Sequence, residues 1–385
     1  MRTATATAAA VTTLLGAGAA AVAAVAAGRY AGDAALRPAP GRPLPGGPRL
    51  SVHAAGDGHV TLTRSLASLR PGTYGLDAPG VHAVVGPVLD GVPHAPDTVV
   101  RRLVRVSHGR LDPGTRVRLT PRLYVGDPRS ALGLDHADVD VPGELGPLPA
   151  WFLPGARTTW VIAVHGLGAT REHPMNLMPF LHRHRLPVLS LAYRNDLGAP
   201  ASPDGLGHLG ESEWRDLDAA LRYAVRYGAE RVVLHGWSTG AAMALHAASR
   251  SALAARIAGL VLDSPVLDWH LTLRALAAAR GVPAPLLPLA VRAAEGRAGL
   301  RGTRAPGVPG APGAPGVPEI PEVPVLMFHG PGDTLAPWDL SRRLAAARPD
   351  LITLHTVPDA PHGAMWNAAP DRYEEALRRF LTPLM

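Results

Sequence analysis

The 385-residue chain contains no cysteine and no lysine. Without cysteine it can form no disulfide, use no thiol nucleophile and carry no lipid on a cysteine anchor. This absence fits a reducing interior and equally an exported protein that dispenses with disulfides. All 38 basic residues are therefore arginine, and together with 42 Gly and 40 Pro this composition is typical of GC-rich coding.

The net charge of +7 would ordinarily favour an anionic partner, but the arginines are spread along the chain. We find no run of arginine interleaved with aromatic residues, so nucleic-acid binding is not predicted. No Gly-rich phosphate loop or dinucleotide fingerprint is present, and we predict no cofactor. His182 and His184 are two positions apart on a predicted helix, which splays their rings, so no metal site is expected.

The first 30 residues hold an uncharged, Ala-rich stretch from Thr3 to Gly28 that follows a single arginine. The stretch is long enough to cross a bilayer, and Ala24-Val25-Ala26 also fits a signal-peptidase site. We expect a signal anchor, with a cleaved signal peptide as the alternative. This predicts a single-pass membrane protein with its main domain outside the cytoplasm, or otherwise a secreted one.

The next segments differ sharply in composition. Residues 31–48 are rich in Pro and Gly and indicate a linker. Residues 49–130 contain short β-type runs broken by Gly, Pro and Asp, which predicts a small all-β module. This module carries no recognisable chemical motif.

From residue 131 to residue 385, apolar strands alternate with amphipathic helices. This alternation predicts an α/β fold, a mostly parallel sheet with helices on both faces. An insert interrupts it: residues 264–302 are helical, apolar and lid-like. Residues 303–323 repeat Gly at every third position and indicate a solvated spacer.

The sequence "GWSTG" at 236–240 places Ser238 between a short buried strand and an Ala-rich helix. A serine at so sharp a turn is exposed at its tip, and small neighbours must make room for it. These are the requirements of the G-x-S-x-G nucleophile elbow. The alternative is an ordinary turn in which the serine caps the following helix. Trp237 flanks the serine and either lines a substrate pocket or packs in the core.

A serine nucleophile needs a base, an acid that orients the base, and donors for the oxyanion. His362, after the last strand, fits the base, and Asp333, in the turn "HGPGD", fits the acid. The backbone N–H groups of Leu167 and Thr239 are the candidate oxyanion donors.

Other acids and histidines receive different interpretations. Asp263 also ends a strand and is the alternative acid, although we expect it to cap the chain where it enters the insert. Asp359 lies too close to His362 in sequence to orient it. Three histidines precede glycine at strand ends and are expected to brace loops: His165, His235 and His329.

With HGLG, GWSTG, HGPGD and PHG in this order along the chain, residues 131–385 resemble the α/β-hydrolase superfamily. The segment at 193–221, "YRNDLGAPASPDGLGHLGESEWRDLDAAL", resembles a membrane-anchored actinobacterial group within it. One departure is Ala241, where many members carry a second Gly. The resemblance implies a serine hydrolase whose partner is a small-molecule ester.

Two other functions remain open from the sequence. The first is a serine peptidase of the prolyl-oligopeptidase type, although the stretch before residue 131 is too short for a propeller. The second is a catalytically inactive binding protein of the cell envelope that has a hydrolase fold. The presence of Ser238, Asp333 and His362 argues against this alternative.

Overall fold

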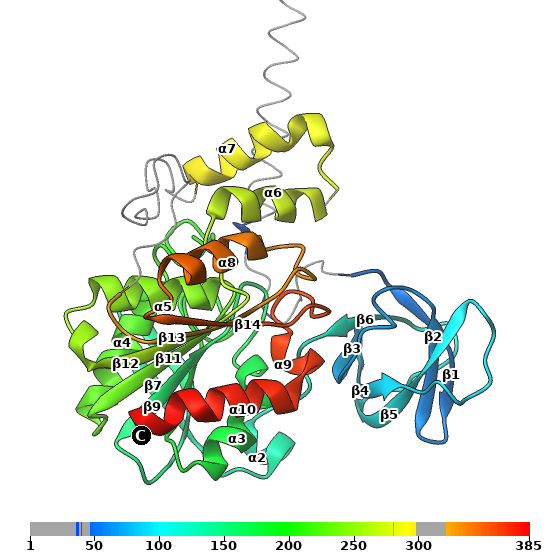
Figure 1. The fold of residues 1–385 in the computed structure, drawn as a ribbon, viewed down its shortest axis with the longest axis horizontal. Coiled ribbons are helices and arrows are strands. Elements are labelled where there is room, and N and C mark those ends of the chain that lie inside the picture. Colours follow the sequence, from blue (N-terminus) through cyan, green and yellow to red (C-terminus); the bar gives the residue numbers. More distant parts are fainter. Residues whose placement is uncertain (1–35, 38–39, 41–46, 280, 298–320) are drawn as a thin grey trace, which may run out of the picture.

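The computed structural model describes residues 36–37, 40, 47–279, 281–297 and 321–385 (Figure 1). The expected signal anchor at 1–30, most of the linker at 31–48 and most of the spacer at 303–323 lie outside these residues. Among the residues that are described, none of the helices has the length and apolar character needed to cross a bilayer.

A small β-barrel precedes the larger domain, as the β-type runs predicted. Its six strands close in the order β1-β2-β5-β4-β3-β6 with antiparallel neighbours. Alternate residues point inward, so that Leu50, Val52, Val60 and Leu62 fill the interior. The strands are β1 Leu50–Gly56, β2 His59–Thr63, β3 Tyr74–Ala78, β4 Val81–Val88, β5 Thr98–His108 and β6 Arg116–Thr120.

The larger domain is built on an eight-stranded sheet in the order β14-β13-β12-β11-β9-β10-β8-β7. Strands β14 to β10 are parallel, and the hairpin β7-β8 adds an antiparallel edge. The strands are β7 Ala137–Gly143, β8 Gly146–Leu153, β9 Thr159–Val164, β10 Val188–Leu191, β11 Arg231–Trp237, β12 Ile257–Asp263, β13 Val325–His329 and β14 Ile352–Thr356. The central strands read as continuous apolar runs because helices cover them on both faces.

Two separate hydrophobic layers hold the helices on the sheet (Figure 1). On one face pack α4 Trp214–Arg226, α5 Thr239–Arg250 and α8 Trp338–Ala347. On the other face pack α3 Met178–Arg183 and α10 Pro370–Leu381. The short helices are α2 Pro128–Leu132 and α9 Met365–Ala368, with 3-10 turns η1 His173–Asn176, η2 Ala254–Arg256, η3 Ala284–Leu286 and η4 Thr382–Leu384. Helix α2 crosses the domain boundary expected at residue 130.

The expected insert forms a helical hairpin of α6 Trp269–Ala279 and α7 Leu287–Arg297. Leu273 and Val291 from this hairpin pack with Leu206 and Leu209 of the loop that follows β10. The hairpin therefore lies above α8 at the carboxyl end of the sheet (Figure 1).

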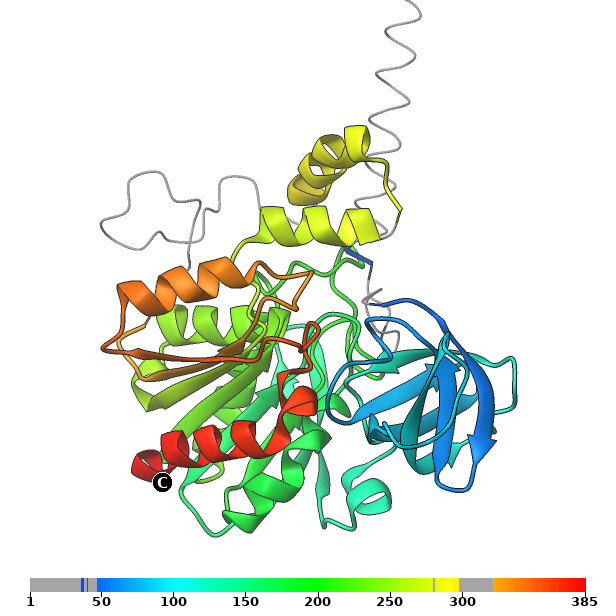
Figure 2. The same ribbon diagram turned by 45° about the vertical axis from the view of Figure 1, so that its right-hand side comes forward.

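The barrel docks on the side of the sheet domain where α9 lies (Figure 2). The side-chain amide of Asn367 donates to the carbonyl oxygens of Thr73 and Pro121, both at 2.9 Å. Ala364 is fully buried and belongs to the hydrophobic core of the barrel. The segment that contains α9 is thus shared between the two units.

Candidate active site

Ser238 occupies a strained turn between β11 and α5. Its φ of 55° and ψ of −115° place a non-glycine residue where side chains are rarely tolerated. A Cβ at Gly236 would collide with the backbone of Gly240, and a Cβ at Gly240 would collide with the carbonyl of Val164. Glycine is therefore required at both flanking positions because a side chain would collide with the backbone there, as the pentapeptide indicated.

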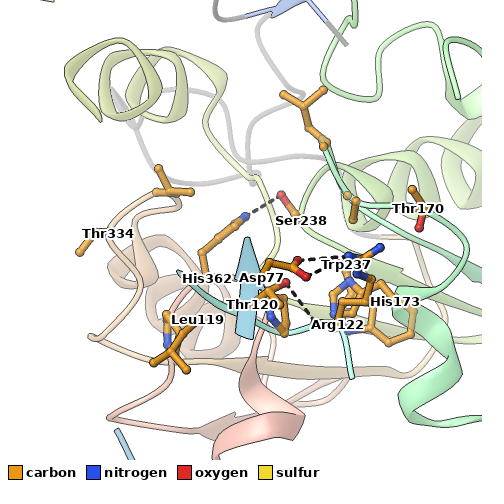
Figure 3. Close-up of a pocket in the computed structure, with 18 of the residues that line it drawn as sticks. Asp77, Leu119, Thr120, Arg122, Thr170, His173, Trp237, Ser238, Thr334 and His362 are labelled. Atoms are coloured by element: carbon orange, nitrogen blue, oxygen red, sulfur yellow. Dashed lines mark hydrogen bonds and ion pairs between the residues drawn. The ribbon is translucent and has the colours of Figure 1, made fainter. Parts of the chain in front are cut away.

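The structure brings together Ser238, His362 and Asp333, which the sequence singled out from three separate loops. The His362 Nε2 lies 2.7 Å from the Ser238 Oγ (Figure 3). The His362 Nδ1 lies 2.7 Å from the Asp333 Oδ2. This geometry matches the neutral tautomer in which Nδ1–H donates to the carboxylate and Nε2 accepts from the serine hydroxyl. Such an arrangement can move a proton from the hydroxyl to the imidazole.

Four donors surround the Asp333 carboxylate. Its Oδ2 accepts from His362 and, at 3.0 Å, from His329, while its Oδ1 accepts from the backbone N–H groups of Leu335 and Ala336. Burial by itself would raise the pKa of Asp333, but His362 and these hydrogen bonds lower it well below its usual range. The carboxylate is therefore ionised near neutral pH.

The pKa of His362 is raised above its ordinary value. Burial alone would lower it, and the adjacent Asp333 carboxylate, which favours the imidazolium, outweighs that effect. A base of this kind is stabilised once it has taken up a proton.

The two expected oxyanion donors lie beside Ser238. Thr239 is the first residue of α5, and Leu167 belongs to the loop after β9. Within the described part of the chain, neither backbone N–H donates to an acceptor. A Cβ at Gly166 would lie only 2.6 Å from the Ser238 Cβ, so glycine lets this loop approach the serine. Both donors remain free for a substrate oxygen.

Asp263 forms no hydrogen bond or ion pair with His362, although its charge contributes to the raised pKa of that histidine. It ends β12, and its Oδ1 accepts a hydrogen bond from the Ser264 hydroxyl at 3.0 Å. Ser264 in turn accepts from the backbone N–H of Gly363, next to His362. Burial raises the pKa of Asp263 to about 7. Asp263 was expected to cap the chain where it enters the insert. Through Ser264 it instead links β12 to the loop that carries His362.

Of the three histidines expected to brace loops, His165 and His329 do so, whereas His235 joins β11 to α10. His165 Nε2 lies 2.9 Å from Asp196, and although burial alone would lower the pKa of His165, this carboxylate raises it. His235 is stacked on Trp237 at 4.0 Å between ring centroids and contacts the Tyr373 hydroxyl, and burial lowers its pKa to about 3. His329 bridges Asp333 and the Ser341 hydroxyl.

A cavity of about 110 Å³ opens beside Ser238 and His362. Its wall includes Trp237, which also packs on His235, so both interpretations of this tryptophan hold. The remaining apolar wall comes mainly from Leu119, Leu167 and Leu335. Among the described residues of the expected lid, 264–279 and 281–297, none lines the cavity.

The barrel supplies the part of the cavity wall that sequence reasoning missed. Arg70, Asp77 and Arg122 all line the cavity, and Figure 3 shows Asp77 and Arg122 near Ser238 and His362. These residues lie in runs with no catalytic motif, and only the docking of the barrel brings them to the serine. His173 of η1 was missed too. Its buried ring lies 5.2 Å from that of Trp237, and burial lowers its pKa to about 3.

Nothing in the described part of the chain suggests a metal centre. No group of three or more His, Asp or Glu side chains lies close enough to hold an ion there. His182 and His184 face different surroundings, since His184 is packed on Phe180 while His182 is exposed.

Comparisons with known proteins agree with this architecture. The model of the alpha/beta hydrolase family matches residues 161–376, and that of a domain of unknown function matches residues 51–120. A search of curated proteins gives no match. An esterase of Pyrococcus furiosus is 19% identical with a TM-score of 0.51, covering 68% of this chain and 95% of its own. The esterase LipW of Mycobacterium marinum is 25% identical with a TM-score of 0.44, covering 66% and 80%. The predicted fold is confirmed.

Proposed function

The chain belongs to the α/β-hydrolase family, and we propose that it is a serine hydrolase that cleaves esters through Ser238, His362 and Asp333. The observation that carries this proposal is the continuous hydrogen-bond chain Ser238–His362–Asp333 at the tip of a strained, glycine-flanked turn. A structural serine would have no need of this conformation.

In the first half of the proposed reaction, the Ser238 Oγ attacks the ester carbonyl while His362 Nε2 takes the hydroxyl proton. The free N–H groups of Leu167 and Thr239 receive the negative oxygen. The tetrahedral intermediate then expels the alcohol, which leaves with the proton from His362, and an acyl-enzyme remains.

In the second half, a water molecule gives its proton to His362 and attacks the acyl carbonyl. The acid product leaves, and the proton returns to the Ser238 Oγ. Asp333 keeps its charge throughout and stabilises the imidazolium. The strong depression of the pKa of Asp333 supports this assignment, because an ionised acid is required at every step.

The cavity favours a small ester over a peptide. Its wall is largely apolar, and the barrel closes one side of it. A peptidase of the prolyl-oligopeptidase type would need a propeller of several blades, whereas the described module before the sheet domain is one closed barrel of six strands.

A fluorophosphonate label, together with nitrophenyl esters of varied acyl length, tests the proposal. Wild-type protein should be labelled once and should hydrolyse short esters. Ser238→Ala should lose the label and about six orders of magnitude in kcat, as other serine hydrolases do when the nucleophile is removed. Ser107→Ala, at an exposed serine of the barrel, is the control and should change neither. Labelling of Ser238→Ala at the wild-type level would refute the proposal.

A further inference from the structure

Arg70 brings a positive charge to the cavity that contains Ser238. It belongs to the barrel loop between β2 and β3, far from any residue of the triad in sequence. The sheet domain supplies the nucleophile and the base, and the barrel supplies this charge. The question is whether the charge is already balanced within the protein.

The other charged residues that the barrel contributes to the wall are balanced. Arg122 donates to both carboxylate oxygens of Asp77, at 3.1 and 3.2 Å, and to Glu172 at 2.6 Å. Burial would lower the pKa of Arg122, but these two carboxylates raise it. Arg122 is therefore committed to contacts within the protein and has little capacity left for a substrate.

Arg70 has no such partner among the residues that the structure describes. No carboxylate lies within 4.0 Å of its guanidinium, and no hydrogen bond from that group is formed there. The side chain is half-buried, and burial lowers its pKa from the ordinary value. A partly desolvated, unpaired charge is costly, and an anion beside it would offset that cost.

The loop that carries Arg70 is fixed from two sides. The fully buried Arg101 donates to the carbonyl oxygens of Ser68, Arg70 and Gly72, at 3.0, 2.7 and 2.8 Å. From the other side, the Thr73 N–H donates to the Asn367 carbonyl at 2.9 Å. The backbone of Arg70 is thus held in place before any ligand arrives, which lowers the entropic cost of binding.

We propose that Arg70 binds a carboxylate of the substrate, so that the preferred substrates are small esters bearing one negative charge. Asp77 and Glu172 both pair with Arg122, so Arg70 is left without a carboxylate partner among the described residues, and one substrate carboxylate would supply that partner. A guanidinium suits that group because its N–H donors match the two carboxylate oxygens. This inference rests on the proposed ester hydrolysis and names its substrate class.

The test compares the nitrophenyl monoester of glutaric acid with nitrophenyl valerate, which has the same acyl length and no charge. The wild-type ratio of kcat/KM, anionic over neutral, should exceed one. Arg70→Ala should lower this ratio by about tenfold to a hundredfold, as expected for loss of a hydrogen-bonded charge pair. Arg70→Lys should recover part of it. Arg102→Ala, at an exposed barrel arginine outside the cavity, controls for net charge and should leave the ratio unchanged.

A wild-type ratio below one, or an unchanged ratio in Arg70→Ala, would overturn the inference while hydrolysis of the valerate ester would still support the proposed function. If neither ester is hydrolysed, calorimetric binding of monomethyl glutarate to Ser238→Ala and to Ser238→Ala/Arg70→Ala decides the matter. Weaker binding to the double variant supports the role of Arg70, and equal or absent binding refutes it.

Discussion

His329 Nε2 lies 3.0 Å from the Asp333 Oδ2, the same carboxylate oxygen that accepts from His362. Both side chains of this pair are fully buried. This contact holds the Oδ2 of Asp333 in place, while the Oδ1 accepts hydrogen bonds from two backbone N–H groups. We therefore expect His329 to act as a positioning residue, which orients His362 through Asp333.

Removal of this contact should affect both stability and catalysis. We expect His329→Leu to lower the free energy of unfolding by about 1.5–3 kcal/mol, because a buried hydrogen bond to a charged group is lost. We also expect a lower kcat with a nearly unchanged KM for nitrophenyl esters. His329→Gln keeps an N–H donor and should recover much of the kcat. Equal kcat in the wild type and His329→Leu would show that the contact is structural only.

The variants Asp333→Asn and Asp263→Asn should distinguish the roles of these two buried acids in catalysis and stability. Asp333→Asn retains the shape of the side chain but loses the charge that stabilises the imidazolium, and kcat should fall by about 10⁴. Asp263→Asn should leave kcat within a few-fold, because Asp263 does not contact His362. Measurement of ester turnover and melting temperature for both variants tests this, and the reverse pattern would move the acid to Asp263.

The raised pKa of Asp263 predicts a pH dependence of stability. With a pKa of about 7 in the folded chain and 3.8 as the ordinary value, the folded state binds the extra proton between these pH values. Stability should therefore fall as the pH rises from about 4 to 7, by at most about 4 kcal/mol from this group. In Asp263→Asn this loss should be absent. Denaturant unfolding at several pH values would show it, and identical pH profiles would contradict it.

His362 must be neutral to accept the serine proton, so kcat/KM should fall as the pH drops through its pKa. That pKa is raised, and the acid limb should lie above pH 6.5. The Asp333 charge raises it, so Asp333→Asn should move the titration of His362 to lower pH. The pH profile of wild-type hydrolysis and NMR titration of the His362 ring in both proteins check this. An unshifted titration would argue against the pairing.

We propose that residues 1–30 bring the catalytic domain to the outer side of a membrane. Cells expressing the full chain should hold it in the membrane fraction, or release a shortened form, and a chain without residues 2–30 should remain soluble inside the cell. That deletion retains Leu36, which packs against the insert hairpin. Identical fractionation of the two chains, with no loss of length, would refute the proposal.

The sheet domain and the proximity of the three candidate residues could be predicted because each depends on local pattern. Ser238, Asp333 and His362 follow strands β11, β13 and β14, and parallel strands bring their carboxyl ends to one edge. Arg70 and Arg122 could not be placed in this way. Alternation along a strand tells which residues face the barrel interior, but it does not tell which rim of the barrel meets another domain.

The packing partners of the insert could not be predicted from the sequence either. Its apolar helices predicted a lid-like segment. The described parts of α6 and α7 do not line the cavity themselves, but they pack on each other, on the loop after β10 and against Leu167, which does line it. Hydrophobic periodicity indicates that a helix buries one face, but it does not identify what lies beneath that face.

The hydrogen bonds of Asn367 to Thr73 and Pro121 join residues 294 and 246 positions apart. Contacts of such sequence separation are costly in loop entropy and form late in folding. The loop of His362 lies directly before α9 and contributes Ala364 to the barrel core. We therefore expect it to reach its final position only after both units have formed and met. During refolding, hydrolytic activity should consequently return after the secondary structure. Its recovery would mark the step at which the loop of His362 reaches its final position.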